Sequence, residues 1–199
     1  MANLVTKDDY KRFKGLSSNG EDARIDQLVR SISALVKTYC GLSFIDYFST
    51  DKTETFTIRE LGTDSLFLDE QPIVSITSVK ERISQSSDYT TLVKTTPFEY
   101  YTDDELGILY RVNDVTPISF PKGPNSVEVI YKSGYENTPK DLELAVYDLI
   151  TYYLKSEHKK EQSIGSTTIT NTNTTSISGD TGFPDHIRRV LDLYKVNII

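Results

Sequence analysis

The chain has 199 residues, 22 of them basic and 29 acidic, and its net charge of −7 argues against binding nucleic acid by broad phosphate neutralisation. This length suits one compact domain, or one with a sizeable insert, and the single Cys40 excludes a disulfide framework within the chain. No apolar run reaches the roughly 18 residues of a membrane span, and the polar residues 1–20 lack the apolar segment of a secretory signal, so no membrane partner is expected.

The N-terminal part of the sequence predicts two helices. Thr6 can cap a short first helix. A longer helix over 22–39 follows, because apolar residues recur there at spacings of three and four. Asn19 or Asp22 can cap this second helix, and Gly41 supplies its end.

The middle of the sequence predicts short strands. Their close spacing and the turn residues between them indicate an antiparallel sheet or a small barrel. The segments are 55–61, 65–68, 73–80, 89–93, 98–101, 108–112 and 126–132.

The C-terminal part predicts two more helices. In the first, over 138–160, Thr138 is the expected N-cap, and Pro139 occupies the first turn, where its missing N–H does no harm. The second begins at 184 or 185 and extends to Tyr194. Because such helices are too short to be stable alone, we expect one bundle. Its predicted core is Leu28, Ile32, Leu35, Val146 and Leu149.

The charge distribution supports an insert between these helices. Residues 1–50 carry 7 basic and 6 acidic side chains, residues 51–137 carry 8 and 15, and residues 138–199 carry 7 and 8. The acidic excess therefore coincides with the predicted strands. The expected fold class is α+β: a small helical bundle from 1–50 and 138–199, with an inserted antiparallel β subdomain over 51–137.

The segment 161–182, called the arm below, precedes the last helix. Ser, Thr, Asn and Gly make up 16 of its 22 residues, and it has no Lys or Arg. This composition is typical of a flexible linker. The even spacing of its threonines also fits a long hairpin loop, which would need a neighbouring copy to pair with, since an isolated polar hairpin is marginal in water. The candidate subunit or channel contacts are Ile164, Thr168, Ile169, Thr170 and Ile177.

Residue patterns typical of catalysis are missing from the sequence. His158 and His186 have no second His or Cys at the spacing of metal ligands. The acidic cluster 103–105 lacks the spacing of a calcium loop and is expected to form a turn between strands. Cys40 has no basic or histidine neighbour, which favours a buried apolar role. With no glycine-rich phosphate loop either, we predict no enzyme, no metal and no cofactor.

The order of these pieces resembles that of the head–tail connector proteins of tailed bacteriophages, also called adaptor or head-completion proteins. The phrases that carry the resemblance are EDARIDQLVRSISALVKTYCG, LFLDEQPIVSITSVK, VEVIYKSGYENTPKDLELAVYDLITYYLKSE and GFPDHIRRVLDLYK. The pattern V.V.Y..GY...P.DL..A..DL and the closing P..I...LD.Y are its strongest parts, and the resemblance covers most of the chain.

The resemblance implies a structural virion protein that is assembled in the cytoplasm of the bacterial host. Members form a ring, usually of twelve copies, in the neck between the portal and the stopper or tail-completion protein. The ring completes the head and extends the channel, through which double-stranded DNA passes without specific binding. An alternative is a tail-completion protein or another phage structural or binding module.

The end of the chain is a further candidate interface. An apolar tail after a helix is typical of a segment that docks on a partner, and the resemblance makes the portal the expected acceptor. The candidate residues are Tyr194, Val196, Ile198 and Ile199.

Overall fold

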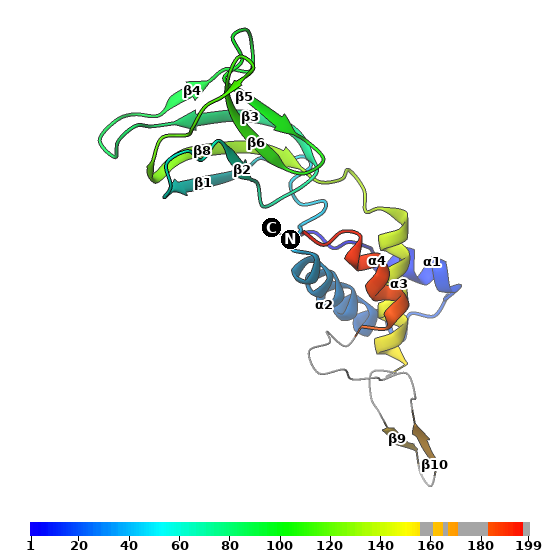
Figure 1. The fold of residues 1–199 in the computed structure, drawn as a ribbon. Helices are drawn as coiled ribbons and strands as arrows, with labels where there is room; N and C mark the ends of the chain where they lie inside the picture. The colour runs from blue at the N-terminus through cyan, green and yellow to red at the C-terminus, as the bar shows by residue number, and fades with distance from the viewer. Residues whose placement is uncertain (156–160, 165–166, 171–182, 197–199) are drawn as a thin grey trace. The chain divides into compact units, whose positions relative to one another are not determined.

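A computed structural model describes residues 1–155, 161–164, 167–170 and 183–196 (Figure 1). Helices at the two ends of the sequence flank a long run of strands, which confirms the predicted α+β class. The chain divides into two compact units. Met1–Leu42 and Thr138–Ile199 form the helical unit, and Ser43–Asn137 forms the β unit.

The first two helices of the helical unit are α1 (Lys7–Lys14) and α2 (Asp22–Cys40). The Oγ1 of Thr6 accepts a hydrogen bond from the N–H of Asp9 at 3.1 Å, which confirms the predicted cap of α1. The predicted end of α2 is also confirmed, because Gly41 adopts a left-handed φ of 74° that stops the helix.

The start of α2 differs from the prediction. Glu21 is the N-cap residue, and no side chain in the described part of the chain caps the helix, so assigning this role to Asn19 or Asp22 was wrong. The Asp22 carboxylate instead binds the Nζ atoms of Lys7 and Lys11 at 2.9 and 2.7 Å. Hydrogen bonds from Lys11 and Lys7 lower the pKa of Asp22, and they hold α1 against the first turn of α2.

The last two helices are α3 (Lys140–Leu154) and α4 (Asp185–Asp192), and α3 is shorter than predicted. The N-cap of α3 is Pro139, so the prediction for Thr138 was wrong. The buried Oγ1 of Thr138 donates instead to the carbonyl oxygen of Leu4 at 2.6 Å. A hydrogen bond to a residue far away in sequence thus replaces the local cap.

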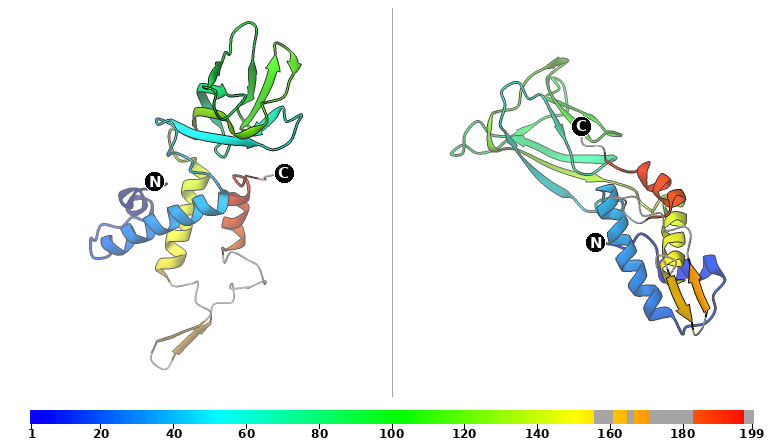
Figure 2. Two further views of the ribbon diagram at one scale, coloured as in Figure 1. Left: turned by 90° about the vertical axis from the view of Figure 1, so that its left-hand side faces the viewer. Right: turned by 60° about the horizontal axis from the view of Figure 1, so that its bottom comes forward.

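The helices pack around one apolar core. α2 contacts each of the other three helices, and both views in Figure 2 show α4 in red alongside α3 in yellow. Ile32, Val146 and Leu149 are buried as predicted. Leu35 was wrongly assigned to the core, since it is 39% exposed, and Leu28 is only half-buried. The buried apolar face of α2 consists of Ile25, Val29, Ile32, Val36 and Cys40.

Leu149→Ala is expected to lower the free energy of unfolding by about 2–5 kcal/mol, because Leu149 is fully buried on α3. Urea unfolding of the variant and the wild type measures the difference. Leu144, on the same helix but 49% exposed, gives the matched control Leu144→Ala. A loss below about 0.5 kcal/mol for Leu149→Ala would contradict the packing of this core.

The β unit contains two antiparallel sheets (Figure 1). The first has the strand order β1 (Lys52–Ile58), β8 (Gly123–Ser133), β3 (Ile73–Glu81) and β4 (Thr90–Leu92). The second has the order β2 (Ser65–Phe67), β6 (Ile108–Asn113) and β5 (Tyr100–Asp103), with β7 (Thr116–Pro117) paired to β6. Each predicted strand overlaps an observed one, and β7 was not predicted.

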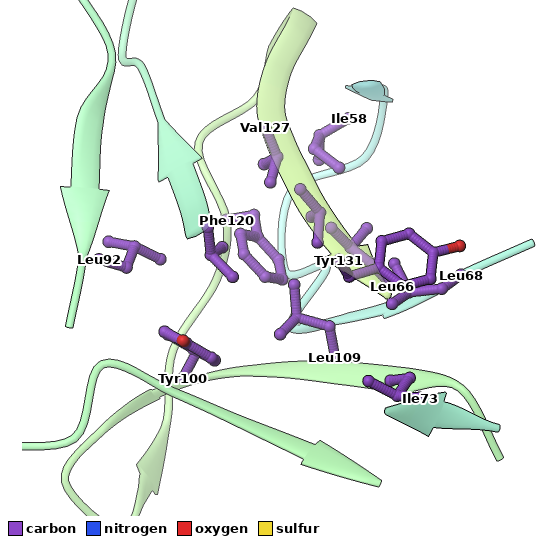
Figure 3. Packing of buried hydrophobic residues seen from close by; sticks show 12 residues of the cluster. Ile58, Leu66, Leu68, Ile73, Leu92, Tyr100, Leu109, Phe120, Val127 and Tyr131 are labelled. Carbon is purple, nitrogen blue, oxygen red and sulfur yellow. The ribbon is translucent and has the colours of Figure 1, made fainter. Parts of the chain in front are cut away.

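Side chains from both sheets meet in one buried cluster. Val127, Val129 and Tyr131 of β8 are fully buried because alternate residues of a strand face the same side. Figure 3 shows Leu109 of β6 and Phe120 pointing toward each other at the centre of the cluster. The apolar residues that alternate along the predicted strands thus form the surface through which the two sheets pack.

The two ends of the β unit are bound to each other. The N–H of Tyr135 donates to the carbonyl oxygen of Phe44 at 2.8 Å, and the N–H of Ser133 donates to that of Tyr47 at 3.1 Å. Gly134 lies between these bonds with a φ of +91°, and a Cβ placed on it would lie 1.9 Å from the carbonyl oxygen of Phe44. This crossing requires glycine.

Candidate functional site

The described part of the arm contains a hairpin. β9 (Glu161–Ile164) pairs antiparallel with β10 (Thr167–Thr170). Within the described residues these two strands form a sheet of their own, so each has a backbone edge that pairs with no other strand. The candidate Ile177 lies outside the described residues. The candidates that lie on the two strands are Ile164, Thr168, Ile169 and Thr170.

The two tail candidates that the structure describes contact their own helical unit. The Oη of Tyr194 donates to Oδ1 of Asp141, near the start of α3, at 2.7 Å. The N–H of Val196 donates to the carbonyl oxygen of Cys40 at 3.0 Å. The other candidates, 198–199, lie outside the described residues. The first part of the tail is therefore bound to the bundle.

Cys40 is buried at the end of α2, as its sequence context predicts. Its Sγ lies 3.6 Å from the carbonyl oxygen of Leu191 on α4. Burial, with a smaller effect of the Asp192 charge, raises the pKa of the thiol to about 12. A thiol that stays protonated at neutral pH is a poor nucleophile, so Cys40 belongs to the core.

The histidines and the acidic cluster that the sequence offers as metal ligands do not form a metal site in the described residues. No group of three or more His, Cys, Asp or Glu among them could hold a metal ion. His186 is exposed in the first turn of α4, and His158 lies outside the described ranges. Asp103 accepts the N–H of Leu106 at 3.0 Å in the predicted turn between β5 and β6. Of the described helices, none combines the length and the apolar character that crossing a membrane requires.

Arg111 joins the two sheets of the β unit through a buried ion pair. It lies on β6 and is 8% exposed. Its Nε and Nη2 donate to Oε2 and Oε1 of Glu81 on β3 at 3.0 and 2.9 Å, which is the strong bidentate geometry. Its Nη1 donates to the carbonyl oxygens of Glu99 and Val112 at 2.7 and 2.8 Å. Since all three nitrogens are bound to the protein, this arginine has a structural role.

A second buried polar cluster holds the start of the β unit. The Oη of Tyr131 donates to Glu54 and accepts the N–H of Glu70 at 3.2 Å. Burial, together with the hydrogen bond to Glu54, raises the pKa of Tyr131 well above its usual value. Burial has the largest single effect on the pKa of Lys52 and lowers it, but the hydrogen bond to Glu54 and the charges of Glu54, Glu70 and Asp69 together outweigh it and raise the pKa. The Glu70 carboxylate accepts the N–H and Oγ of Ser43 at 2.8 and 2.6 Å.

A hollow of about 860 Å³ lies at β5, β6 and β7, and we call it the β5–β7 groove. Several of its large side chains are exposed: Phe98 by 43%, Tyr101 by 60% and Val115 by 85%. The rings of Tyr101 and Tyr110 lie 6.2 Å apart between centroids. The residue patterns of the sequence did not predict this groove. Its one sequence signal is the doublet at 100–101, where the first tyrosine is buried and the second faces outward.

Comparison with known proteins finds relatives of this chain both in sequence and in fold. A family model described as "Head completion protein" matches residues 3–197. The head completion protein of Escherichia phage T5 is 25% identical over 192 residues, which are 96% of this chain and 98% of that protein.

Solved structures of a gene transfer agent share the fold. A chain in the virion of the native gene transfer agent particle has a TM-score of 0.60 and 14% identity, with 98% of this chain and 91% of that chain covered. A chain in the neck of the native particle, computed with C12 symmetry, has a TM-score of 0.55 and 15% identity, with 100% and 97% covered. Both units of the chain therefore lie within the shared fold.

Proposed function

The chain belongs to the head completion protein family, and from this membership we propose that it forms a homo-oligomeric ring between the portal and the stopper or tail-completion protein. It is a structural protein of the virion and not an enzyme. The observation that carries the proposal is the family match over residues 3–197, which spans the helices, the sheets and the arm. We place the ring in the neck of the virion and its assembly in the cytoplasm of the bacterial host.

We propose twelve copies in the ring. The neck of the gene transfer agent, which contains a related fold, was computed with C12 symmetry for the native particle and with C6 symmetry for the empty one, and the C12 neck supports this number. A ring closes through heterologous contacts, in which one surface of a subunit binds a different surface of the next. The oligomer formed by the purified chain, with and without portal, tests the proposal. A ring with portal is expected, and monomers under both conditions would contradict it.

The charge of the β subdomain bears on its place in such a ring. Residues 51–137 carry 8 basic and 15 acidic side chains. Many copies of this charge facing one channel would repel each other, so we propose that the subdomain lies on the outside or along the side of the ring. A channel with few cations would let double-stranded DNA pass without specific binding. A ring structure with this sheet at the channel centre would contradict the placement.

We propose that the arm contacts an adjacent subunit or projects towards the channel, and that the tail docks on the portal. The paired strands β9 and β10 support a contact between the arm and an adjacent subunit, because their outer edges can accept a further strand. The apolar residues Val196, Ile198 and Ile199 support the proposed docking of the tail on the portal.

Deleting 165–180 is expected to leave the subunit folded but to impair ring assembly or retention of DNA in the head. The reason is that the segment connects two helices of a unit whose core lies elsewhere. Thermal unfolding measures the first effect, and electron microscopy with infectivity measures the second. A variant with the same residues in scrambled order controls for length. An unfolded subunit, or fully infectious particles, would show that the arm proposal is wrong.

A further inference from the structure

We propose that the β5–β7 groove of one subunit binds the C-terminal end of α1, residues 12–16, of a neighbouring subunit. The proposal rests on the ring proposed above and deepens it by naming the two surfaces that meet. The groove supplies aromatic side chains and carboxylates, whereas the end of α1 supplies apolar side chains and cations.

The groove has the apolar exposure of a surface that a partner covers. Tyr101 and Val115, which both line the groove, expose 60% and 85% of their area. Contiguous exposed apolar groups of this kind mark interaction sites on soluble proteins. Tyrosine is also among the residues most enriched in the centres of protein interfaces.

The charges of the groove favour a cationic partner. Asp64, Asp103 and Asp114 lie in its lining. In the described ranges of the chain, no cation forms a salt bridge with Asp64 or Asp114. Of the two cations in the lining, Arg111 is neutralised by its buried ion pair with Glu81. The other cation is Lys94, and one positive charge does not balance the three carboxylates, so the groove carries a net negative charge.

The end of α1 has the complementary character. Phe13 and Leu16 are each 46% exposed. The Nζ of Lys14 lies 4.8 Å from the centroid of the Phe13 ring, so the cation and the apolar face are presented together. Arg12 adds a second basic group, which is paired with Asp9 at 3.1 Å but has 79% of its side chain accessible.

This end of α1 is also held in one conformation before it binds. The Phe13 ring stacks on Tyr147 of α3 with centroids 4.9 Å apart and planes inclined by 22°. The N–H of Leu16 donates to the carbonyl oxygen of Lys11 at 2.9 Å. Ordering in advance reduces the entropy that binding removes.

The groove and the end of α1 are different surfaces, so the contact can run in one direction from each subunit to the next. The groove belongs to the β unit and the end of α1 to the helical unit. A contact between unlike surfaces is heterologous, and repeated around an axis it closes a ring.

A charge exchange tests the contact in the full-length chain, with portal present. Asp114→Lys and Lys14→Asp are each expected to weaken assembly on the order of tenfold, which is typical of groups in direct contact. The variant carrying both substitutions should assemble close to the wild type, because the charges are exchanged and remain opposite. Asp88→Lys makes the same charge change at an exposed site outside the groove and should leave assembly unchanged. Sedimentation velocity measures the oligomers.

A cysteine pair tests the same contact by geometry. The only native thiol, Cys40, is 1% exposed and does not compete. A chain with Leu16→Cys and Val115→Cys is expected to give covalent oligomers on oxidation, and either cysteine alone should give none beyond a dimer. Cross-links confined to single chains would overturn the proposal.

The outcomes separate this proposal from the ring itself. Wild-type rings that resist all of these substitutions would overturn the α1 contact and leave the ring proposal standing. If the wild type forms no ring with portal, the proposed function fails and the contact fails with it. Recovery by the charge exchange, together with intermolecular cross-links, would support both.

Discussion

Arg111→Met is expected to lower the free energy of unfolding of the β unit by about 3–5 kcal/mol, the loss that follows when one partner of a buried ion pair is removed. The Glu81 carboxylate, whose side chain is 16% exposed, would lose its bidentate partner. The carbonyl oxygens of Glu99 and Val112 would each lose a donor as well. The chain has 13 tyrosines and no tryptophan, so tyrosine fluorescence during urea unfolding measures the loss.

Two further variants distinguish this explanation from a general effect of charge. Lys80→Met removes the partner of Glu128, 2.7 Å away, but this pair is more accessible and should contribute about 1 kcal/mol or less. The double variant Arg111→Met with Glu81→Met should regain most of the stability, because neither charge is then left unpaired. A double variant as unstable as Arg111→Met alone would contradict the explanation.

Gly134→Ala is expected to destabilise the β unit by about 3 kcal/mol or more, the sum of backbone strain and overpacking. A methyl group there would lie 1.9 Å from the carbonyl oxygen of Phe44, and the φ of +91° is unfavourable for alanine. Relieving the overlap would break the hydrogen bond from Tyr135 to that carbonyl group. Urea unfolding and hydrogen exchange of the β8 amides measure the effect.

Gly62 provides the matched control because its φ of +92° is almost the same. Apart from Gly62 and its two chain neighbours, no described residue places an atom within 4 Å of the position of its Cβ. Gly62→Ala therefore reports the backbone strain alone, about 1–2 kcal/mol. Equal losses for the two substitutions would show that the close approach to Phe44 is unimportant.

Local sequence patterns located the helices and strands well, but they were less accurate about which face of a helix is buried and which residue caps it. Apolar spacing located α2, but two adjacent apolar stripes run along it, and the choice of Leu35 rather than Val36 for the core was wrong. Period alone cannot decide between neighbouring stripes, because the decision depends on which helices pack against α2. The same applies to Thr138 and Asp22, which bind distant partners where local capping rules assign them a helix end.

The polar contacts of the β unit depend on strand order, which the sequence pattern left open. Arg111 and Glu81 are 30 residues apart and meet because β6 and β3 belong to two sheets that face each other. The groove has the same origin, since its lining comes from separate strands. The family, in contrast, was inferred from a resemblance spread over the chain, and the family match confirms it.

The helical unit is assembled from both ends of the chain, whereas the β unit is one continuous stretch. On the ribosome, α2 is therefore made first and its partners α3 and α4 last. At about 5–20 residues per second, α2 waits on the order of ten seconds with its apolar face uncovered. The β unit has all of its strands once β8 is made, before α3 and α4, and can fold on the nascent chain. The order of folding then differs from the order of synthesis, because the first long helix to be made is among the last elements to reach its native contacts.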